Sequence, residues 1–312
     1  MKLVRGIHNI REWHHGCVLT IGNFDAVHRG HQALLQYLKR QGQRLYLPTM
    51  VMIFEPQPLE FFLGRHAPAR LTCLRDKVRY FTEYGVDYLL CIKFNAAFSL
   101  LSPHTFVSQL LVKKLGVKFL AIGDDFRFGK NRRGHFQYLC TAGEKYDFQV
   151  ANTDSFCDSG KRISSTAVRQ ALLSDNITLA ESLLGHHYRL SGRVIHGSQL
   201  GSKIGVPTAN IQFKCLVMPV KGVYVAKVYG LGDYPLKAVV NIGHRPTVNG
   251  VEKKIEVHLM DVNINIYGHH IDVVLCKKLR NERRFASTEE LRKQIDKDIM
   301  AAKQFFQLPL LR

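Results

Sequence analysis

An apolar run followed by a glycine turn and two histidines constrains this chain more than any other feature. Residues 17–21 predict a buried strand, and a helical apolar pattern begins at residue 33. Between them lie Gly22 and the sequence His28-Arg29-Gly30-His31. A helix N-terminus attracts anions through its free backbone N–H groups and its dipole. The segment therefore predicts a strand–turn–helix unit with a phosphate site, in which Gly30 allows close approach and His28 and His31 donate to phosphate oxygens.

A second segment, residues 162–169, has a similar polar character at a predicted helix start. Ser164 and Thr166 supply hydroxyl groups, and Arg169 supplies a guanidinium group. Together the two segments resemble the nucleotidyltransferase superfamily, whose members move a nucleoside monophosphate from a triphosphate to a phosphorylated acceptor.

The first part of the chain alternates between strand and helix patterns. Apolar runs at residues 45–54, 88–92 and 119–122 are separated by helical segments. Such alternation requires crossover connections, a parallel sheet and ligands at the carboxyl ends of the strands. We therefore expect a doubly wound α/β fold of the Rossmann type, with its site at the turn carrying His28 and His31.

After residue 185 the pattern changes. Strand-like segments at residues 189–195, 222–229, 237–242, 255–262 and 271–275 are separated by turns, which predicts a small antiparallel β-barrel. One helix follows a capping box at residues 287–290, and its apolar stripe is expected to pack on the barrel. The expected domains are residues 1–185 and 186–312, and a fragment beginning near His186 is expected to fold alone.

The barrel segment carries its own polar cluster. Gly197, Gly201 and Gly205 recur at four-residue spacing and predict either a loop whose amides wrap a polyphosphate or a simple glycine-rich hairpin turn. Thr208 and Asn210 offer oxygen ligands of the kind that Mg²⁺ shares with phosphates. Glu256 begins an alternating apolar segment and is either a rim residue or a general base.

From Gly22 to about residue 306, these motifs resemble the bifunctional bacterial riboflavin kinase/FMN adenylyltransferase family, also called FAD synthetase. The resemblance implies that riboflavin, FMN and ATP are substrates, that FAD is the product, and that Mg²⁺ is the metal. It places ATP and phosphate contacts in the first domain at Gly22, Phe24, Gly30, Ser164 and Thr166, and catalytic roles at His28, His31, Arg169 and Glu256. It places flavin contacts at Asp125, Arg280, Glu282 and Phe285. ATP contacts in the kinase fall at Gly197, Gly201 and Gly205, and metal ligands at Thr208 and Asn210.

Three positions depart from the family pattern. Gln57 replaces a common histidine and puts a flavin or phosphate contact in doubt. His135 replaces a usual aspartate and is expected to weaken a helix cap. Lys203 replaces a frequent arginine, which keeps the charge but loses bidentate geometry.

Composition bounds the alternatives. The net charge of +19 calls for anionic partners, but the basic residues are scattered, so nucleotide phosphates are favoured over nucleic acid or a membrane. Seven separated cysteines without a C-x-x-C pair, and no long apolar segment, predict a reduced cytoplasmic protein. The histidine pairs His14-His15, His186-His187 and His269-His270 are expected to be surface or linker residues. The rival hypotheses are another adenylyl- or cytidylyltransferase and an RNA-binding protein; the oligomeric state stays open.

Overall fold

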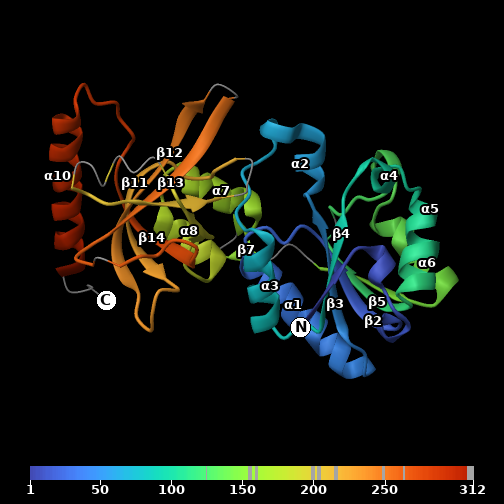
Figure 1. Ribbon diagram of the computed structural model, residues 1–312. Helices are drawn as coiled ribbons and strands as arrows, with labels where there is room; N and C mark the ends of the chain where they lie inside the picture. Colours follow the sequence, from blue (N-terminus) through green and yellow to red (C-terminus); the bar gives the residue numbers. More distant parts are fainter. Residues whose placement is uncertain are drawn as a thin grey trace. The chain divides into compact units, whose positions relative to one another are not determined.

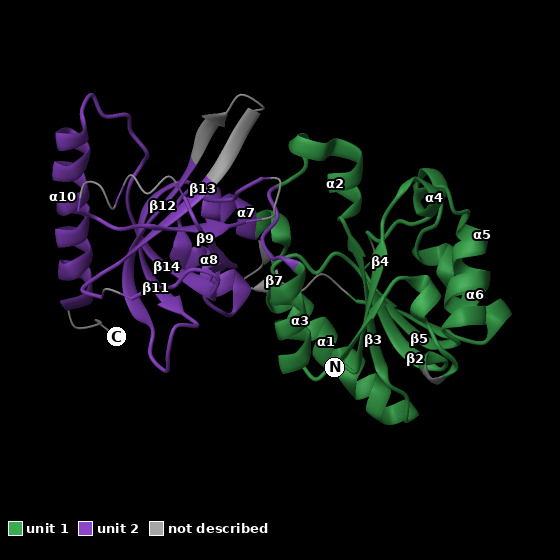
Figure 2. Ribbon diagram, in the orientation of Figure 1, with its two compact units in different colours: residues 1–68, 74–167 green, residues 69–73, 168–312 purple. Residues whose placement is uncertain are grey.

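The computed structural model describes residues 1–123, 125–153, 157–158, 161–197, 201, 205–213, 217–247, 250–262 and 264–307. The chain divides into two compact units (Figure 2). Unit 1 comprises Met1–Pro68 and Leu74–Ala167, and unit 2 comprises Ala69–Cys73 and Val168–Arg312. The domain boundary expected near residue 185 stays a prediction.

Unit 1 is built on a parallel sheet of six strands in the order β1-β4-β3-β2-β5-β6 (Figure 1). Its strands are β1 (Lys2–Arg5), β2 (Cys17–Ile21), β3 (Thr49–Glu55), β4 (Tyr88–Lys93), β5 (Val117–Ile122) and β6 (Gln149–Asn152). After β2 the chain builds β3 and β4 on one side, and then crosses to place β5 on the other side. The order therefore reverses between β2 and β5, and ligands bind at such a switch point in open α/β sheets.

Helices complete unit 1. They are α1 (Arg29–Leu45), α2 (Pro58–Leu63), α3 (Leu74–Glu83), α4 (Ala96–Ser99), α5 (Pro103–Thr105), the π-helix η4 (Phe106–Lys114), α6 (Phe136–Tyr146) and the first residues of α7 (Ser165–Leu173). Short 3₁₀ turns are η1 (Ile7–Asn9), η2 (Glu12–His14), η3 (Gly64–His66) and η5 (Lys130–Arg132), and β7 (Cys157–Asp158) pairs with β8 (Lys161–Arg162).

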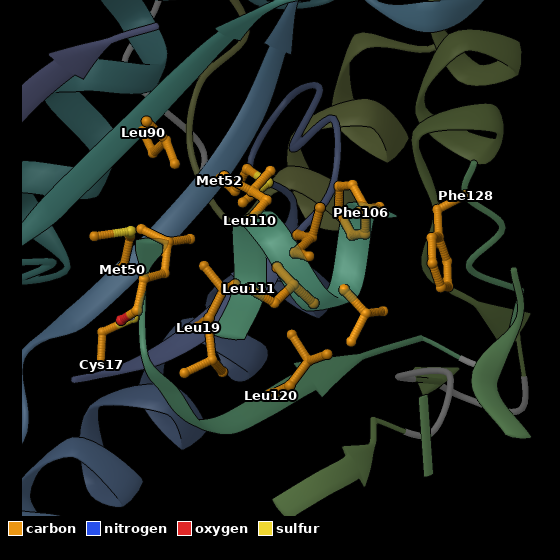
Figure 3. Packing of buried hydrophobic residues seen from close by; sticks show 14 of the residues in the cluster. Cys17, Leu19, Met50, Met52, Leu90, Phe106, Leu110, Leu111, Leu120 and Phe128 are labelled. Carbon is orange, nitrogen blue, oxygen red and sulfur yellow. The ribbon is translucent and has the colours of Figure 1, made fainter. Parts of the chain in front are cut away.

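Both faces of this sheet are buried. In β2, Cys17 and Leu19 join one core cluster, to which η4 contributes Leu110 and Leu111 (Figure 3). Val18 points to the other cluster, which includes side chains of α1 and α3. Two covered faces are typical of a doubly wound sheet, so the expected α/β fold is confirmed.

Local sequence signals in unit 1 agree with the structure at one helix start and differ from it at one strand start. Ser102 Oγ accepts a hydrogen bond from the Thr105 N–H at 3.0 Å, as its position before Pro103 predicts. The expected strand at residues 45–54 begins only at Thr49, because α1 runs to Leu45 and Tyr46 ends it in the left-handed conformation.

Of two expectations about histidines, the one for His14 was wrong. His135 Nδ1 accepts a hydrogen bond from the Tyr138 N–H at 3.4 Å, so His135 caps α6 through a long hydrogen bond, and the expected weakening of this cap stays a prediction. His14 is buried rather than at the surface: its ring meets Tyr88 edge-on, and its Nδ1 accepts from the Arg11 N–H at 2.8 Å. Burial lowers the pKa of His14, so its ring suits an apolar site.

Unit 2 is a closed antiparallel barrel of order β10-β13-β12-β11-β14-β9. Its strands are β9 (Arg189–Ile195), β10 (Ala209–Gln212), β11 (Gly222–Tyr229), β12 (Leu236–Thr247), β13 (Gly250–Leu259) and β14 (His270–Arg280). The expected barrel is confirmed. Sequence reasoning missed β10, because a strand of only four residues has no distinct apolar pattern.

The C-terminal helix α10 (Thr288–Gln307) packs on this barrel. At its start, Ser287 Oγ accepts from the Glu290 N–H at 3.2 Å, while Glu290 Oε2 accepts from the Ala286 N–H at 3.1 Å. The predicted capping box thus forms with its second hydrogen bond one residue earlier. Further along, Ala302 joins the barrel core beside Val223, as the apolar stripe predicts.

Unit 2 also includes the segment before the barrel. There α8 (Ile177–Leu184) contacts β14. In the turn before it, the Asp175 carboxylate accepts from Lys278 Nζ at 2.7 Å and from the Tyr224 hydroxyl at 3.4 Å. The barrel is therefore supported by residues on the N-terminal side of Gly185.

We expect a fragment of residues 168–312 to be more stable than one of residues 186–312. The shorter fragment loses the buried side chains of Ile177 and Leu184, each worth about 1.5–3 kcal/mol, and the Asp175 carboxylate. Thermal unfolding followed by circular dichroism measures the difference. In the longer fragment, Asp175→Asn is the matched control for the partly exposed ion pair and should cost at most about 1 kcal/mol. Equal stability of both fragments would show that α8 is dispensable.

Candidate active sites

A cavity of about 650 Å³ lies in unit 1 beside the end of β2 and the loop after β5. It is therefore at the switch point of the sheet. The sequence-predicted residues that line it are Gly22, Phe24, His28, Gly30, His31, Asp125, Ser164 and Thr166. Asn152, the last residue of β6, and Thr153 directly after it also contribute to the wall.

His28 is the N-cap of α1. Its Nδ1 accepts a hydrogen bond from the His31 backbone N–H at 3.4 Å, and its backbone is extended. Because Nδ1 is the acceptor, the proton of a neutral ring lies on Nε2. His28 can therefore donate from Nε2 at the positive end of α1.

His31 lies in the first turn of the same helix, stacked on His28. The ring centroids are 3.7 Å apart and the planes 19° apart. Phe24 packs on His31 from another direction, with centroids 4.8 Å apart. Burial lowers the pKa of His31 well below its usual value, and the nearby His28 and Lys77 lower it further. Its Nδ1 is enclosed and has no hydrogen-bond partner in the described part of the chain. His31 is thus a neutral ring held by its neighbours.

The positions of Gly22 and Phe24 follow from this packing. Phe24 is 2% exposed and meets Phe81 of α3 edge-on at 5.4 Å. A Cβ at Gly22 would press against the Phe24 ring. Both residues therefore support His31, and their expected contacts with ATP stay predictions.

The second predicted phosphate segment meets the first one. Ser164 Oγ accepts from the Ala167 N–H at 3.2 Å at the start of α7, and Ser165 Oγ donates to the Asp25 carbonyl at 2.8 Å. Sequence reasoning missed this role of Ser165. Arg169 belongs to unit 2, where its Nε donates to the Ala69 carbonyl at 2.6 Å; its expected role at the phosphates stays a prediction.

Gln57 and the residues around it form a further feature of unit 1. Gln57 is 7% exposed at the start of α2, and its Nε2 has no partner among the described residues. Nearby, Phe61 and Phe62 each meet Phe94 edge-on, and both are partly exposed. Sequence reasoning did not single out this aromatic group. Lys203, the third departure, lies outside the described residues.

Unit 2 has a cavity of about 160 Å³ that collects most of the predicted kinase residues. Its lining includes Gly201, Thr208, Glu256, Arg280, Glu282 and Phe285. Asn210 of β10 and Asn241 of β12 are both register partners of Glu256 in β13. The three residues thus form one row across neighbouring strands.

Two polar contacts lie beside this row. Lys254 Nζ lies 2.6 Å from Glu256 Oε1, two residues away on the same strand. A His258 ring nitrogen, Nδ1, lies 2.9 Å from the Pro207 carbonyl oxygen, directly before Thr208. Sequence reasoning missed Lys254 and His258, because a polar residue on an alternating strand has no distinguishing signal.

A neighbouring cavity of about 250 Å³ is lined by Thr208, Ile264, Tyr267 and other residues of unit 2. Thr208 lines this cavity and the smaller one. It therefore stands where two ligands in adjacent cavities would meet.

The glycines before Thr208 make room for side chains. A Cβ at Gly197 would overlap the Asn210 amide, and a Cβ at Gly201 would press on Thr208 Oγ1. Gly205 has φ +78°, which favours glycine. The two predicted metal ligands are therefore seated against the glycines. Polyphosphate binding by this loop stays a prediction.

The expected flavin segment, residues 279–285, is held by α10. Arg280 Nε lies 3.0 Å from both carboxylate oxygens of Asp298, and Arg280 Nη2 donates to Oδ2 at 2.8 Å. Phe285 lies near two guanidinium groups, 5.8 Å from Arg280 and 4.8 Å from Arg283. The Nε and Nη2 atoms of the Arg280 guanidinium group are thus engaged by Asp298. Sequence reasoning missed Asp298, which is buried.

We expect His31 to remain neutral in the folded protein at pH values where an ordinary histidine becomes charged. In NMR titrations with ¹³C-labelled histidine, its ring signal should not shift between about pH 8 and about pH 6, whereas in urea it should titrate near 6.5. Since the folded pKa is the lower one, proton uptake by the unfolded chain lowers the stability as the pH falls below about 6.5. His31→Asn assigns the signal. Ordinary titration of the folded protein would contradict the enclosed site.

The comparisons with known proteins cover both units. The FAD synthetase family model matches residues 10–167, and the riboflavin kinase model matches residues 184–306. A bifunctional riboflavin kinase/FMN adenylyltransferase of Escherichia coli (strain K12) is 59% identical over 309 residues, which are 99% of this chain and 99% of that one. Relatives of the same name in Haemophilus influenzae and Pseudomonas fluorescens are 49% and 47% identical, over 98% and 97% of this chain and 99% and 97% of theirs.

A solved structure has a similar fold. The crystal structure of a macrolide-efflux protein from Streptococcus pneumoniae has a TM-score of 0.79 and 27% identity, covering 97% of this chain and 99% of that one. In the described part of the present chain, no helix has the length and apolar character needed to cross a membrane. Two family models match successive parts of the chain, and relatives match it over its full length. The chain therefore belongs to the bifunctional riboflavin kinase/FMN adenylyltransferase family.

Proposed function

We propose that unit 1 transfers the adenylyl group of ATP to FMN, giving FAD and pyrophosphate, and that unit 2 transfers the γ-phosphoryl group of ATP to riboflavin, giving FMN. The observation that carries this proposal is that each family match contains its own cavity, lined by the motif residues of that match. Other nucleotidyltransferase chemistry would leave the barrel cavity without a role.

In unit 1, an oxygen of the FMN phosphate attacks the α-phosphorus of ATP, and the bond to the leaving pyrophosphate breaks. The protein needs to supply position and charge stabilisation rather than a nucleophile. His28 donates from Nε2, and the N-terminus of α1 favours negative charge developing on the polyphosphate. Because the His31 ring is neutral, it stacks on His28 without adding a buried charge to the site. Ser164 and Thr166 contact the phosphates from the opposite segment.

The flavin of FMN needs a flat apolar surface in unit 1. The exposed face of the Phe61 or the Phe62 ring offers such a surface, while Asp125 lines the cavity of unit 1. Aromatic faces stack on planar ring systems with a gain beyond simple burial. The unpartnered Nε2 of Gln57 offers a donor in the position where the family often has histidine.

In unit 2, Glu256 accepts the proton of the terminal ribityl hydroxyl as that oxygen attacks the γ-phosphorus of ATP, and the bond from the γ-phosphorus to the leaving ADP breaks. Riboflavin occupies the cavity that Phe285 and Glu282 line, and ATP occupies the adjacent cavity. Thr208 borders both, so phosphoryl transfer takes place beside it. Lys254 holds the Glu256 carboxylate in its row and offsets its charge.

Thr208 and Asn210 fit a magnesium site. Hydroxyl and amide oxygens are hard ligands, and the two side chains are fixed against Gly201 and Gly197. Among the described residues, no group of three or more His, Cys, Asp or Glu side chains could hold a metal. A site with few protein ligands suits Mg²⁺, which is usually shared with substrate phosphates. When bound, Mg²⁺ offsets phosphate charge.

The cysteines bear on the location of the protein. Cys17, Cys140 and Cys276 are free thiols, and burial raises the pKa of Cys17 to about 12. The buried Cys17 thiol is therefore unreactive, which supports the expected cytoplasmic location.

The two activities should be separable by single substitutions. His28→Ala or His31→Ala should lower FAD formation from FMN about 10²–10³-fold, because a preorganised donor or its support is lost. Riboflavin phosphorylation should continue, so FMN accumulates.

Glu256→Gln should have the opposite effect, lowering riboflavin phosphorylation about 10²–10⁴-fold while supplied FMN is still adenylylated. Chromatography of flavins after incubation with riboflavin, ATP and Mg²⁺ measures both. Parallel loss of both activities in either variant would contradict two independent sites.

Asn210→Asp should change the metal dependence of the kinase. An added carboxylate changes the charge of the ligand set, so the Mg²⁺ concentration giving half-maximal rate should shift before the riboflavin KM changes. Adenylylation of FMN by the same variant is the matched control and should keep its Mg²⁺ curve. An unchanged kinase curve would remove Asn210 from the ligand set.

A further inference from the structure

The loop between β2 and α1 has a costly backbone conformation. Phe24, Ala26 and Val27 have φ values of 47°, 80° and 44° in the left-handed region, although none is glycine. For a β-branched residue such as Val27, this conformation is a genuine outlier. A loop of this kind persists only where the surrounding structure holds it. Since the loop lines the unit 1 cavity, what holds it also shapes the site.

Side chains from three helices hold alternate carbonyl groups of this loop. Lys77 Nζ of α3 donates to the Asn23 carbonyl at 2.7 Å. Ser165 Oγ of α7 donates to the Asp25 carbonyl at 2.8 Å, and Gln32 Nε2 of α1 donates to the Val27 carbonyl at 2.8 Å. These contacts join residues 54, 140 and 5 positions apart in the chain.

This arrangement matters for an anion site. A carbonyl oxygen carries partial negative charge and would repel a phosphate, whereas the backbone N–H groups attract it. Each carbonyl that accepts from a fixed side chain is kept from turning toward the ligand. Alternate carbonyls held in this way leave the loop's amides as the groups available to the phosphate.

Lys77 differs from the other two donors because it carries charge. Its side chain is 0% exposed, which is rare for lysine and costs desolvation energy. The ammonium also lies close enough to His31 to help lower the pKa of that ring. The buried charge therefore acts on both the loop and one of its histidines.

We propose that Lys77 is a positioning residue of the adenylyl-transfer site, where it holds the phosphate-binding loop open to the ATP polyphosphate together with Ser165 and Gln32. The proposal rests on the proposed function of unit 1. Lys77 does not itself contact substrate; it acts through the Asn23 carbonyl. Its effect should therefore fall on the polyphosphate and not on the flavin.

The test is the full-length variant Lys77→Met, which keeps the apolar length and removes the donor. KM for ATP and the inhibition constant of inorganic pyrophosphate should both rise roughly 10- to 100-fold, as expected for a lost hydrogen bond from a charged group. KM for FMN should change little, and riboflavin kinase activity should stay at the wild-type rate. Lys113→Met, at an exposed lysine of the same unit, is the matched control and should change none of these values.

The outcomes separate this inference from the proposed function. Absence of FAD synthesis in the wild-type protein would refute the function itself. A folded Lys77→Met protein with wild-type ATP and pyrophosphate constants would refute the role of Lys77. If circular dichroism shows that Lys77→Met does not fold, Ser165→Ala and Gln32→Leu decide. A selective rise of the same two constants supports the proposal, and unchanged constants overturn it.

Discussion

The hydrogen bond from the His31 N–H to His28 Nδ1 is the interaction on which the candidate adenylyl-transfer site depends. It starts α1 at the point where the strained loop ends, and it fixes the proton of a neutral His28 on Nε2. It also keeps the two imidazole rings stacked, with Phe24 packed beside His31. A side chain that could not accept at this position would leave the helix start uncapped and the two rings without a fixed relation.

The proposed function requires both units to bind a polyphosphate, and the two folds offer different means. Unit 1 offers backbone amides and a helix dipole at the switch point of a parallel sheet, where the carboxyl ends of all strands lie on one edge. A closed antiparallel barrel has no such edge. Unit 2 instead aligns side chains across strands, so that Asn210, Glu256 and Asn241 form one row. This difference explains why the first site is marked by histidines at a helix start and the second by scattered polar residues.

Predictability from sequence follows the range of the interaction. The strand–turn–helix unit, the barrel and the helix capped near Ser287 were predicted because periodicity and caps act over a few residues. Lys77 and Asp298 were missed because their partners lie 54 and 18 residues away and no local pattern marks them. His14 was wrongly expected at the surface, since its burial depends on Tyr88, which lies far along the chain in β4. The fold could therefore be predicted from the sequence, whereas the side chains that hold the residues of each site in place could not.

The spacing of glycines in the sequence does not reveal which side chains pack against them. The spacing of Gly197, Gly201 and Gly205 suggests amides exposed to phosphate, yet the first two lie against the side chains of Asn210 and Thr208. Gly243 is similar, because a Cβ there would overlap the Glu282 carboxylate. In each case the absence of a side chain on glycine sets the place of a polar group elsewhere. A substitution at such a glycine would therefore act on the kinase through the displaced partner, even where the loop backbone kept its conformation.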